Sequence, residues 1–173
     1  MTKVKYYFSQ KRLEYKLRAQ SKIALVSDVD GVLTDGKFHY SEKGKIFKIF
    51  GSHDADALNL LTLDKRVSIF FLTADARGFE ISAKRISDMG FNVQLMGPSE
   101  RVDFISELKR EFFTIYVGDS FTDINSMKLS DFSIAPNNAH ERARKNADLI
   151  TMSNSAEGAM SEICLLIIHS LRK

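Results

Sequence analysis

The chain alternates short apolar runs with longer segments whose apolar residues recur every three or four positions. Continuous runs predict buried strands, and the helical spacing of Ala57, Leu58 and Leu61 predicts an amphipathic helix. Between the first strand and that helix, aromatic and apolar residues alternate around a polar turn, which predicts a β-hairpin over 37–50. The predicted strands are 23–27, 67–72, 91–96, 114–117, 132–135 and 148–151. The predicted helices are 54–64, 77–89, 99–112, a short one after 118, 139–145 and a last amphipathic one.

This order predicts an α/β fold: a doubly wound, mostly parallel sheet with helices on both faces, plus a hairpin after the first strand. A chain of 173 residues with 44% hydrophobic content can bury one sizeable core. Two prolines, no repeat and no low-complexity tract argue against a linker. We therefore expect a basic N-terminal helix or arm over 1–21 and a single catalytic domain over 22–173.

Charge is uneven along the chain. Residues 1–22 carry seven Lys or Arg against Glu14 alone, a net charge of +6, and the remainder carries −3. This basic segment is typical of a solvated helix or of an arm that packs on a neighbouring subunit. A nucleic-acid or membrane contact is the alternative, but no nucleic-acid-binding motif accompanies the charge. We expect neither partner.

The single cysteine, Cys164, lies in an apolar run and is typical of core packing. It excludes a disulfide framework and fits a reducing compartment. The first residues lack a signal-peptide core, and no apolar run reaches membrane-spanning length. These features predict a cytoplasmic protein.

Polar residues follow three of the predicted strands directly: Asp28, Thr73 and Asp119. Ligands of parallel sheets bind beyond the carboxyl ends of the strands. One fold therefore brings these three residues to one edge. A threonine after a strand is more often a turn or cap residue, and a Gly-Asp pair can simply begin a helix. Their common order makes a functional site the better interpretation.

The segment Asp28-Val29-Asp30-Gly31-Val32-Leu33-Thr34 places two carboxylates one residue apart. Such close like charges need a cation or hydrogen-bond donors. A polar turn would explain Gly31 alone. An EF-hand would need an acid or amide, glycine and glutamate where Val32, Leu33 and His39 stand. A P-loop sequence and zinc-ligand spacing are both absent.

These residue types suit phosphoryl transfer. Asp28 can attack phosphorus and form an aspartyl-phosphate, while Asp30 can act as general acid and then as general base. Attack by one anion on another calls for Mg²⁺, with Asp28, Asp30 and Asp119 as ligands. Asp123 lies one turn further as an additional ligand or a partner of the ligands. The Thr73 hydroxyl and the loop amide at Ala74 can hold phosphate oxygens.

These motifs resemble the haloacid dehalogenase superfamily of Mg²⁺-dependent phosphatases over about residues 22–170. The start D-V-D-G-V-L-T-D-G, the hairpin and G-D-S-F-T-D are similar to its cap-less branch. That branch includes 3-deoxy-D-manno-octulosonate 8-phosphate phosphatases and nonulosonate 9-phosphate phosphatases. The resemblance implies a phosphomonoesterase of sugar-acid phosphates. It also implies a homotetramer in which the hairpins form a barrel and a neighbour covers each site. Consistently, only 44 residues separate Asp28 from Thr73, which leaves no room for a lid domain.

The chain differs from this branch at several positions. Arg101 stands where the resemblance places the phosphate-binding lysine, and it keeps the charge with a bulkier group. Ala74-Asp75 replaces a Gly-Arg pair, and Glu157 replaces a further arginine. The candidates for substrate contacts are Thr34, Arg77 and His53. Lys45, Lys48 and His53 are candidates for hairpin and neighbour contacts, although surface lysines usually only add solubility.

Two other functions remain open at this point. Arg101 and the altered loop at 74–75 would fit a non-catalytic relative that binds phosphate and Mg²⁺ as a regulatory partner. A phospho-accepting receiver also uses aspartate and Mg²⁺ on a parallel sheet. Receivers lack the D-x-D-G-x-x-T pairing and the later G-D-x-x-x-D. The sequence favours the phosphatase.

Overall fold

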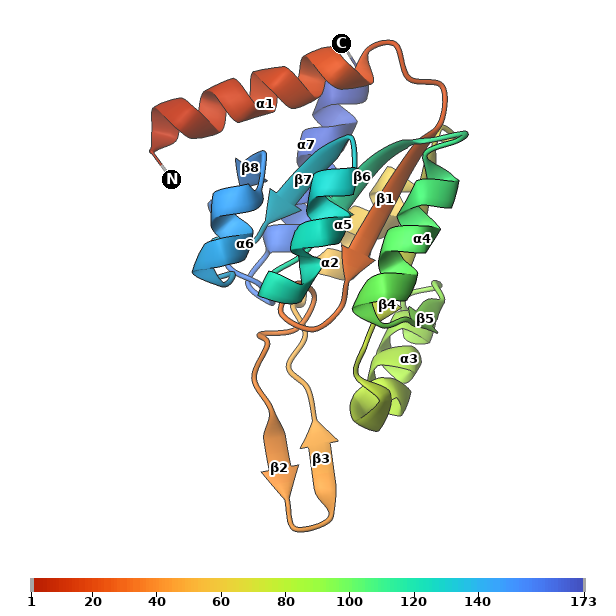
Figure 1. The fold of residues 1–173 in the computed structure, drawn as a ribbon, viewed down its shortest axis with the longest axis vertical. Coiled ribbons are helices and arrows are strands. Elements are labelled where there is room, and N and C mark those ends of the chain that lie inside the picture. The colour runs from red at the N-terminus through yellow and green to blue at the C-terminus, as the bar shows by residue number, and fades with distance from the viewer. Residues whose placement is uncertain (1, 173) are drawn as a thin grey trace.

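The protein is built on a parallel sheet whose strand order is β5-β4-β1-β6-β7-β8 (Figure 1). The structure, a computed structural model, describes residues 2–172. All five neighbouring strand pairs of this sheet run parallel, which confirms the predicted doubly wound fold class. The strands are β1 (Ile23–Asp28), β4 (Val67–Thr73), β5 (Val93–Leu95), β6 (Phe113–Val117), β7 (Phe132–Ala135) and β8 (Leu149–Ile150).

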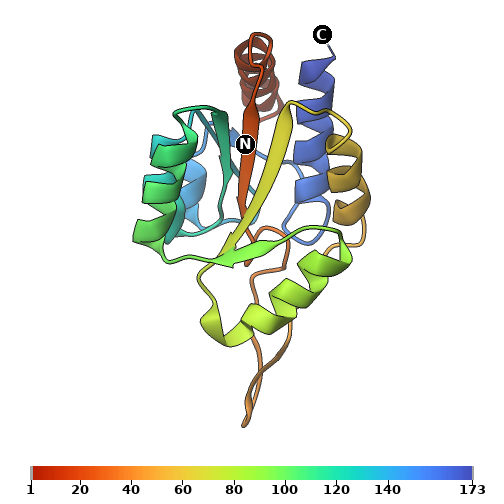
Figure 2. The same cartoon turned by 90° about the vertical axis from the view of Figure 1, so that its right-hand side faces the viewer.

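Helices cover both faces of the sheet, as Figure 2 shows edge-on. Side chains of β1 point alternately to the two faces: Leu25 joins one buried cluster, and Ala24 and Val26 join the other. The first face carries α2 (Asp54–Leu61), α3 (Phe79–Asp88) and α7 (Ala159–Leu171). The second carries α4 (Pro98–Leu108), α5 (Ile124–Leu129) and α6 (Glu141–Asn146). Two short 3₁₀ turns, η1 (Ala76–Gly78) and η2 (Phe121–Asp123), lie in the loops after β4 and β6. Because both faces are covered, all six residues of β1 are buried.

The predicted hairpin is confirmed as β2 (His39–Ser41) and β3 (Gly44–Phe47), an antiparallel pair. It leaves the carboxyl end of β1 and projects well beyond the body of the molecule (Figure 1). Within residues 2–172, the connection from β1 to β4 holds only this hairpin and α2, so no lid domain covers the sheet edge. The site at this edge is therefore open within one chain.

The N-terminal helix α1 (Lys3–Leu17) packs on the chain's own body. Leu13 and Leu17 are fully buried in the core, and the Ser9 hydroxyl donates to the Asp148 carbonyl at 2.7 Å. The helix expected in the basic segment is therefore present. Its Leu13 and Leu17 face packs on the chain's own body, while most of its charged side chains stay exposed; a contact with a neighbour stays a prediction. No helix among residues 2–172 is long and apolar enough to cross a membrane.

Candidate active site

Three adjacent strands bring the predicted acidic and hydroxyl residues to one edge of the sheet. Asp28 ends β1, Thr73 ends β4, and Asp119 follows β6 by two residues. The parallel register pairs Asp28 with Leu72, next to Thr73. It also pairs Ser27 with Val117, two residues before Asp119. Strand pairing alone thus explains why Thr73 and Asp119, 45 and 91 residues after Asp28 in the sequence, meet it here.

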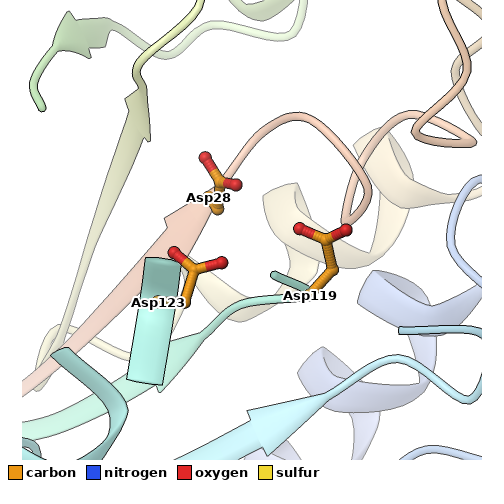
Figure 3. Close-up of side chains that lie close together, drawn as sticks. All are labelled: Asp28, Asp119 and Asp123. Atoms are coloured by element: carbon orange, nitrogen blue, oxygen red, sulfur yellow. The ribbon is translucent and has the colours of Figure 1, made fainter. Parts of the chain in front are cut away.

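Three carboxylates converge at this edge, those of Asp28, Asp119 and Asp123 (Figure 3). One oxygen from each lies within 4.8 Å of the others. Burial, with the nearby Asp123, Asp119 and Asp30 charges adding to it, raises the pKa of Asp28 well above its ordinary range, and Arg101 only partly opposes this. Burial and the Asp123 charge likewise raise the pKa of Asp119 to about 7. Clustered oxygen donors with excess negative charge fit a hard divalent cation such as Mg²⁺.

Gly31 makes the approach of Asp119 possible. Its φ of +85° lies in the left-handed region that favours glycine, and a Cβ there would meet Asp119 Oδ2 at 2.1 Å. Glycine is therefore required at position 31 for two reasons: its backbone has a positive φ, and the Asp119 carboxylate occupies the space where a Cβ would lie. Sequence reasoning assigned it only to a turn.

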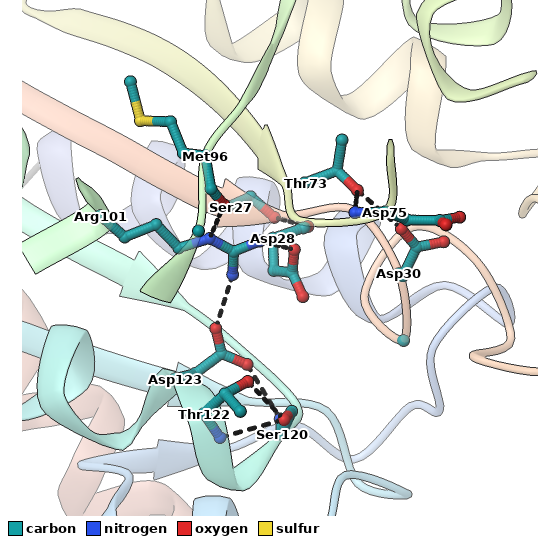
Figure 4. A network of polar contacts seen from close by, with 12 residues as sticks. Ser27, Asp28, Asp30, Thr73, Asp75, Met96, Arg101, Ser120, Thr122 and Asp123 are labelled. Atoms are coloured by element: carbon teal, nitrogen blue, oxygen red, sulfur yellow. Dashed lines mark hydrogen bonds and ion pairs between the residues drawn. The ribbon is translucent and has the colours of Figure 1, made fainter. Parts of the chain in front are cut away.

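Arg101 lies between the acidic side chains (Figure 4). One guanidinium nitrogen, Nη2, donates to Asp28 Oδ1 at 2.9 Å, and Nη1 donates to Asp123 Oδ1 at 2.9 Å. The side chain is 4% exposed, and Nε donates to the Met96 carbonyl at 3.1 Å. Burial opposes the charge, but the carboxylates of Asp28 and Asp123 hold the pKa of Arg101 above its ordinary value. A buried arginine thus supplies a fixed cation beside the predicted nucleophile.

Asp123 is fixed from three sides. Its Oδ1 also accepts from the Tyr116 hydroxyl at 2.7 Å, and its Oδ2 accepts from the Ser120 backbone N–H at 2.9 Å. Sequence reasoning placed Asp123 as a further ligand or a partner of the ligands, and its position within the carboxylate cluster is compatible with both. Tyr116 was missed, because a tyrosine inside a buried strand gives no signal beyond packing.

Asp30 points away from the three-carboxylate cluster and contacts a different set of side chains. The Thr73 hydroxyl donates to Asp30 Oδ2 at 2.9 Å, and the Asp75 backbone N–H donates to Thr73 Oγ1 at 3.1 Å. Lys48 Nζ lies 2.7 Å from Asp30 Oδ1. The acid/base candidate therefore lies beside the predicted phosphate-binding threonine. The sequence also made Asp30 a metal ligand, but its carboxylate is not part of the cluster of Asp28, Asp119 and Asp123.

A cavity of about 340 Å³ opens over these groups. Its lining includes Asp28, Asp30, Ala74, Arg101 and Asp119. The three residues predicted to contact substrate are not among those that line this cavity. Thr34 is buried and accepts from the Gly31 and Gly36 backbone N–H groups, Arg77 is exposed on η1, and His53 lines a separate cavity beside α7.

The sequence did not predict the buried contacts that the two hairpin lysines make with Asp30 and Asp75. Lys45 pairs with Asp75 and lies over the Phe38 ring, and Lys48 contacts both Asp30 and Asp75. One sequence signal could have indicated Lys48: it is the single charged residue in the run Ile46-Phe47-Lys48-Ile49-Phe50. A lysine that interrupts an apolar run on a hairpin can point inward.

Sequence and structure comparisons agree on the class of protein. Residues 111–163 match the model of haloacid dehalogenase-like hydrolases. Over this segment the chain is similar to haloacid dehalogenase-like hydrolases, and the resemblance drawn from its motifs is confirmed.

Individual relatives are similar over nearly the whole chain. The 3-deoxy-D-manno-octulosonate 8-phosphate phosphatase of Haemophilus influenzae is 27% identical over 154 residues, covering 86% of this chain and 84% of the relative. A cobalt-bound structure of the deoxy-D-mannose-octulosonate 8-phosphate phosphatase from Haemophilus influenzae is 25% identical, with a TM-score of 0.75, covering 94% of this chain and 92% of that one. The Moraxella catarrhalis phosphatase, in complex with magnesium, phosphate and 3-deoxy-D-manno-octulosonate (KDO), gives a TM-score of 0.80 at 22% identity, covering 94% and 93%. The prediction of an enzyme of the haloacid dehalogenase phosphatase type is confirmed.

Proposed function

We propose that the chain is a Mg²⁺-dependent phosphomonoesterase that hydrolyses a phosphorylated sugar acid through an aspartyl-phosphate on Asp28. One observation carries the proposal. Asp28 lines an open cavity with Arg101 at 2.9 Å, and carboxylates of Asp119 and Asp123 lie within 4.8 Å of its own. A buried carboxylate so placed has a cation beside it and an open side from which phosphate can approach.

The chain's own residues account for both steps. Asp28 attacks phosphorus, the new bond forms between its oxygen and phosphorus, and the bond to the leaving oxygen breaks. Asp30 gives its proton to that oxygen and then takes one from the water that cleaves the phosphoryl–Asp28 bond. Thr73, the Ala74 amide and Arg101 are the proposed holders of the phosphate oxygens.

Mg²⁺ is the proposed cofactor, held by Asp28 and Asp119 with Asp123 supporting the site. Asp30, the third ligand expected from the sequence, has its carboxylate on Thr73 and Lys48 instead. The fit rests on three clustered acidic side chains, of which only Asp28 and Asp123 pair with Arg101, because that single cation leaves part of their charge uncompensated. When bound, Mg²⁺ supplies positive charge that lowers the repulsion between phosphate and carboxylate.

The substrate class follows from the relatives. They are named for 3-deoxy-D-manno-octulosonate 8-phosphate, and the motifs also resemble those of nonulosonate 9-phosphate phosphatases. In this chain Asp75 and Ala74 line the cavity where a basic contact was expected. We therefore propose a phosphorylated eight- or nine-carbon sugar acid, and a phosphate-release screen over both classes distinguishes them.

A homotetramer in which a neighbour covers the site is also proposed. Five large apolar side chains of the projecting hairpin are exposed: Phe38, Tyr40, Ile46, Phe47 and Ile49. An apolar patch of this kind is typical of a protein interface. Ile46→Lys should convert the assembly to smaller species in analytical ultracentrifugation, whereas Leu63→Lys, on a residue 72% exposed outside the hairpin, should leave it intact. An unchanged sedimentation coefficient in Ile46→Lys would contradict the proposal.

The test of the activity is Asp28→Asn, assayed with p-nitrophenyl phosphate and Mg²⁺. We expect loss of phosphate release with an unchanged circular dichroism spectrum, because asparagine keeps the shape but is no nucleophile. Mg²⁺-dependent turnover by this variant would contradict the assignment of Asp28. A wild-type protein without turnover on any phosphate ester would favour the non-catalytic relative.

A further inference from the structure

One lysine of the hairpin, Lys48, points into the body of the molecule. The Lys48 side chain is 2% exposed, whereas its neighbours Phe47 and Ile49 are 47% and 46% exposed. Lys37, at the start of the same hairpin, has a side chain that is 77% exposed. An arrangement with the charge inside and the apolar groups outside opposes ordinary burial preferences. The interactions of Lys48 must therefore offset the cost of burying its charge.

Lys48 has three polar partners, one for each N–H of its ammonium group. Its Nζ lies 2.7 Å from Asp30 Oδ1 and 2.9 Å from Asp75 Oδ2, and it donates to Ser82 Oγ at 2.7 Å. Ser82 belongs to α3 and is fully buried. Lys48 thus joins the hairpin, α3 and the loops after β1 and β4 at one point.

Both oxygens of the Asp30 carboxylate are held in this way. Lys48 holds Oδ1 at 2.7 Å, and the Thr73 hydroxyl donates to Oδ2 at 2.9 Å. The two contacts come from different elements, the hairpin and the end of β4, so the plane and direction of the carboxylate are fixed. Figure 4 shows Asp30 beside Thr73 and Asp75, apart from the Arg101 and Asp123 pair.

Asp75 is paired to both hairpin lysines, Lys45 and Lys48, whereas Asp30 contacts Lys48 alone of the two. Although burial acts in the opposite direction, these two lysines lower the pKa of Asp75, which therefore stays ionised. Lys48 acts on Asp30 by holding it in one direction, because the charge of Lys48 is shared with Asp75.

We propose that Lys48 is a positioning residue that orients the Asp30 carboxyl group for proton transfer to the leaving oxygen. The inference rests on the proposed function. Lys48 neither loses nor gains a proton: the Asp30 proton moves to the leaving oxygen as the phosphorus–oxygen bond breaks. Proton transfer depends first on geometry, so a loosened Asp30 slows the reaction even though every reacting group is still present.

The leaving group provides the discriminating measurement. An alkyl phosphate has a poor leaving group and needs the proton, whereas p-nitrophenolate leaves with little help from an acid. In Lys48→Met we expect kcat for 6-phosphogluconate, an alkyl phosphate, to fall about 100-fold. We expect kcat for p-nitrophenyl phosphate to fall less than about 5-fold. KM should change little for both, and Lys48→Arg should restore part of the alkyl activity, because it keeps the donors.

Lys43→Met is the matched control, since Lys43 is an exposed lysine on the turn of the same hairpin. It should leave both activities unchanged. Equal losses for the two esters in Lys48→Met, a change confined to KM, or the same losses in Lys43→Met would each overturn the inference. Equal losses with a lower melting temperature would mean that Lys48 only stabilises the fold.

A crystal structure of Lys48→Met tests the geometry without any turnover. We expect the Asp30 carboxylate to leave Thr73, since one of its two contacts is gone. An Asp30 that stays hydrogen-bonded to Thr73 overturns the inference even in an active enzyme. Conversely, a wild type that hydrolyses no phosphate ester overturns the proposed function, and the position of Asp30 in the variant still decides whether Lys48 holds it.

Discussion

Replacing Arg101 with methionine removes the cation shared by two buried acidic side chains. In the wild type, Arg101 contacts Asp28 and Asp123 at 2.9 Å each, and the two carboxylate side chains are 9% and 1% exposed. Methionine fills much of the volume and offers no charge. Breaking a buried ion pair from one side costs about 3–5 kcal/mol. For a chain of this length, this corresponds to a fall in melting temperature of about 6–20 °C.

The pH dependence and the metal dependence of this loss follow from its cause. Without Arg101 the pKa of Asp28 rises further, so the variant loses stability as pH increases and the carboxyl group ionises. The deficit should therefore be larger at about pH 8 than at about pH 6. Added Mg²⁺ replaces part of the missing positive charge and should stabilise Arg101→Met more than the wild type.

Differential scanning calorimetry in EDTA and then in Mg²⁺ measures both effects. The matched control is Arg110→Met, because Arg110 is 74% exposed and pairs with Glu107 on the surface. This exposed pair contributes at most about 1 kcal/mol, so the control should melt within a few degrees of wild type. The reasoning is refuted if Arg101→Met melts as the control does in EDTA, or if Mg²⁺ leaves the gap between variant and wild type unchanged.

Three further predictions concern the same site. Gly31→Ala should weaken Mg²⁺ binding in calorimetric titration, because its Cβ would meet Asp119. The control Gly90→Ala should leave Mg²⁺ binding unchanged, because Gly90 has a similar φ of +88° and a Cβ there would meet nothing within 4 Å. Equal effects on Mg²⁺ binding would contradict the steric argument. Tyr116→Phe should cost about 1–3 kcal/mol in urea unfolding, because the hydroxyl donates to buried Asp123; a neutral result would mean that this bond adds nothing. The pKa of Asp119 is raised to about 7, so the metal-free protein should lose stability as pH rises through 7, while its affinity for Mg²⁺ increases. Stability that rises over this pH range, or Mg²⁺ affinity that falls, would contradict the raised pKa.

The fold could be predicted from the sequence because its strands are buried on both faces. Continuous apolar runs located β1, and they located β7 at its observed bounds. The boundaries of helices were less certain. The helix predicted over 99–112 ends at Leu108, because Phe112, the last apolar residue of that segment, lies in the turn just before β6 begins at Phe113.

The packing of α1 was the less predictable part of the N-terminal segment. Its charges predicted a solvated helix or an arm on a neighbouring subunit, and Leu13 and Leu17 bury one face of the helix against the body. Two apolar residues at helical spacing decided the packing of a segment that is mostly polar.

The sequence predicted the positions of those site residues that directly follow a strand, such as Asp28 and Asp119. Asp28 and Asp119 meet because β1 and β6 are neighbours, and alternation of strands and helices already implied a common edge. The partners of Asp30 were not predictable, since Lys48 reaches it from a hairpin whose direction no local pattern fixes. For the same reason, nothing in the sequence placed His53 in a separate cavity.

The central claim is that Asp28 becomes phosphorylated, and the most direct measurement is to trap that species. Asp30→Asn removes the base for the second step, while p-nitrophenyl phosphate needs no acid for the first. Acid quenching of this variant with Mg²⁺ and the aryl phosphate, followed by peptide mass spectrometry, should find one phosphoryl group on Asp28. Release of p-nitrophenol with Asp28 unmodified, or with the phosphoryl group on another residue, would contradict the account.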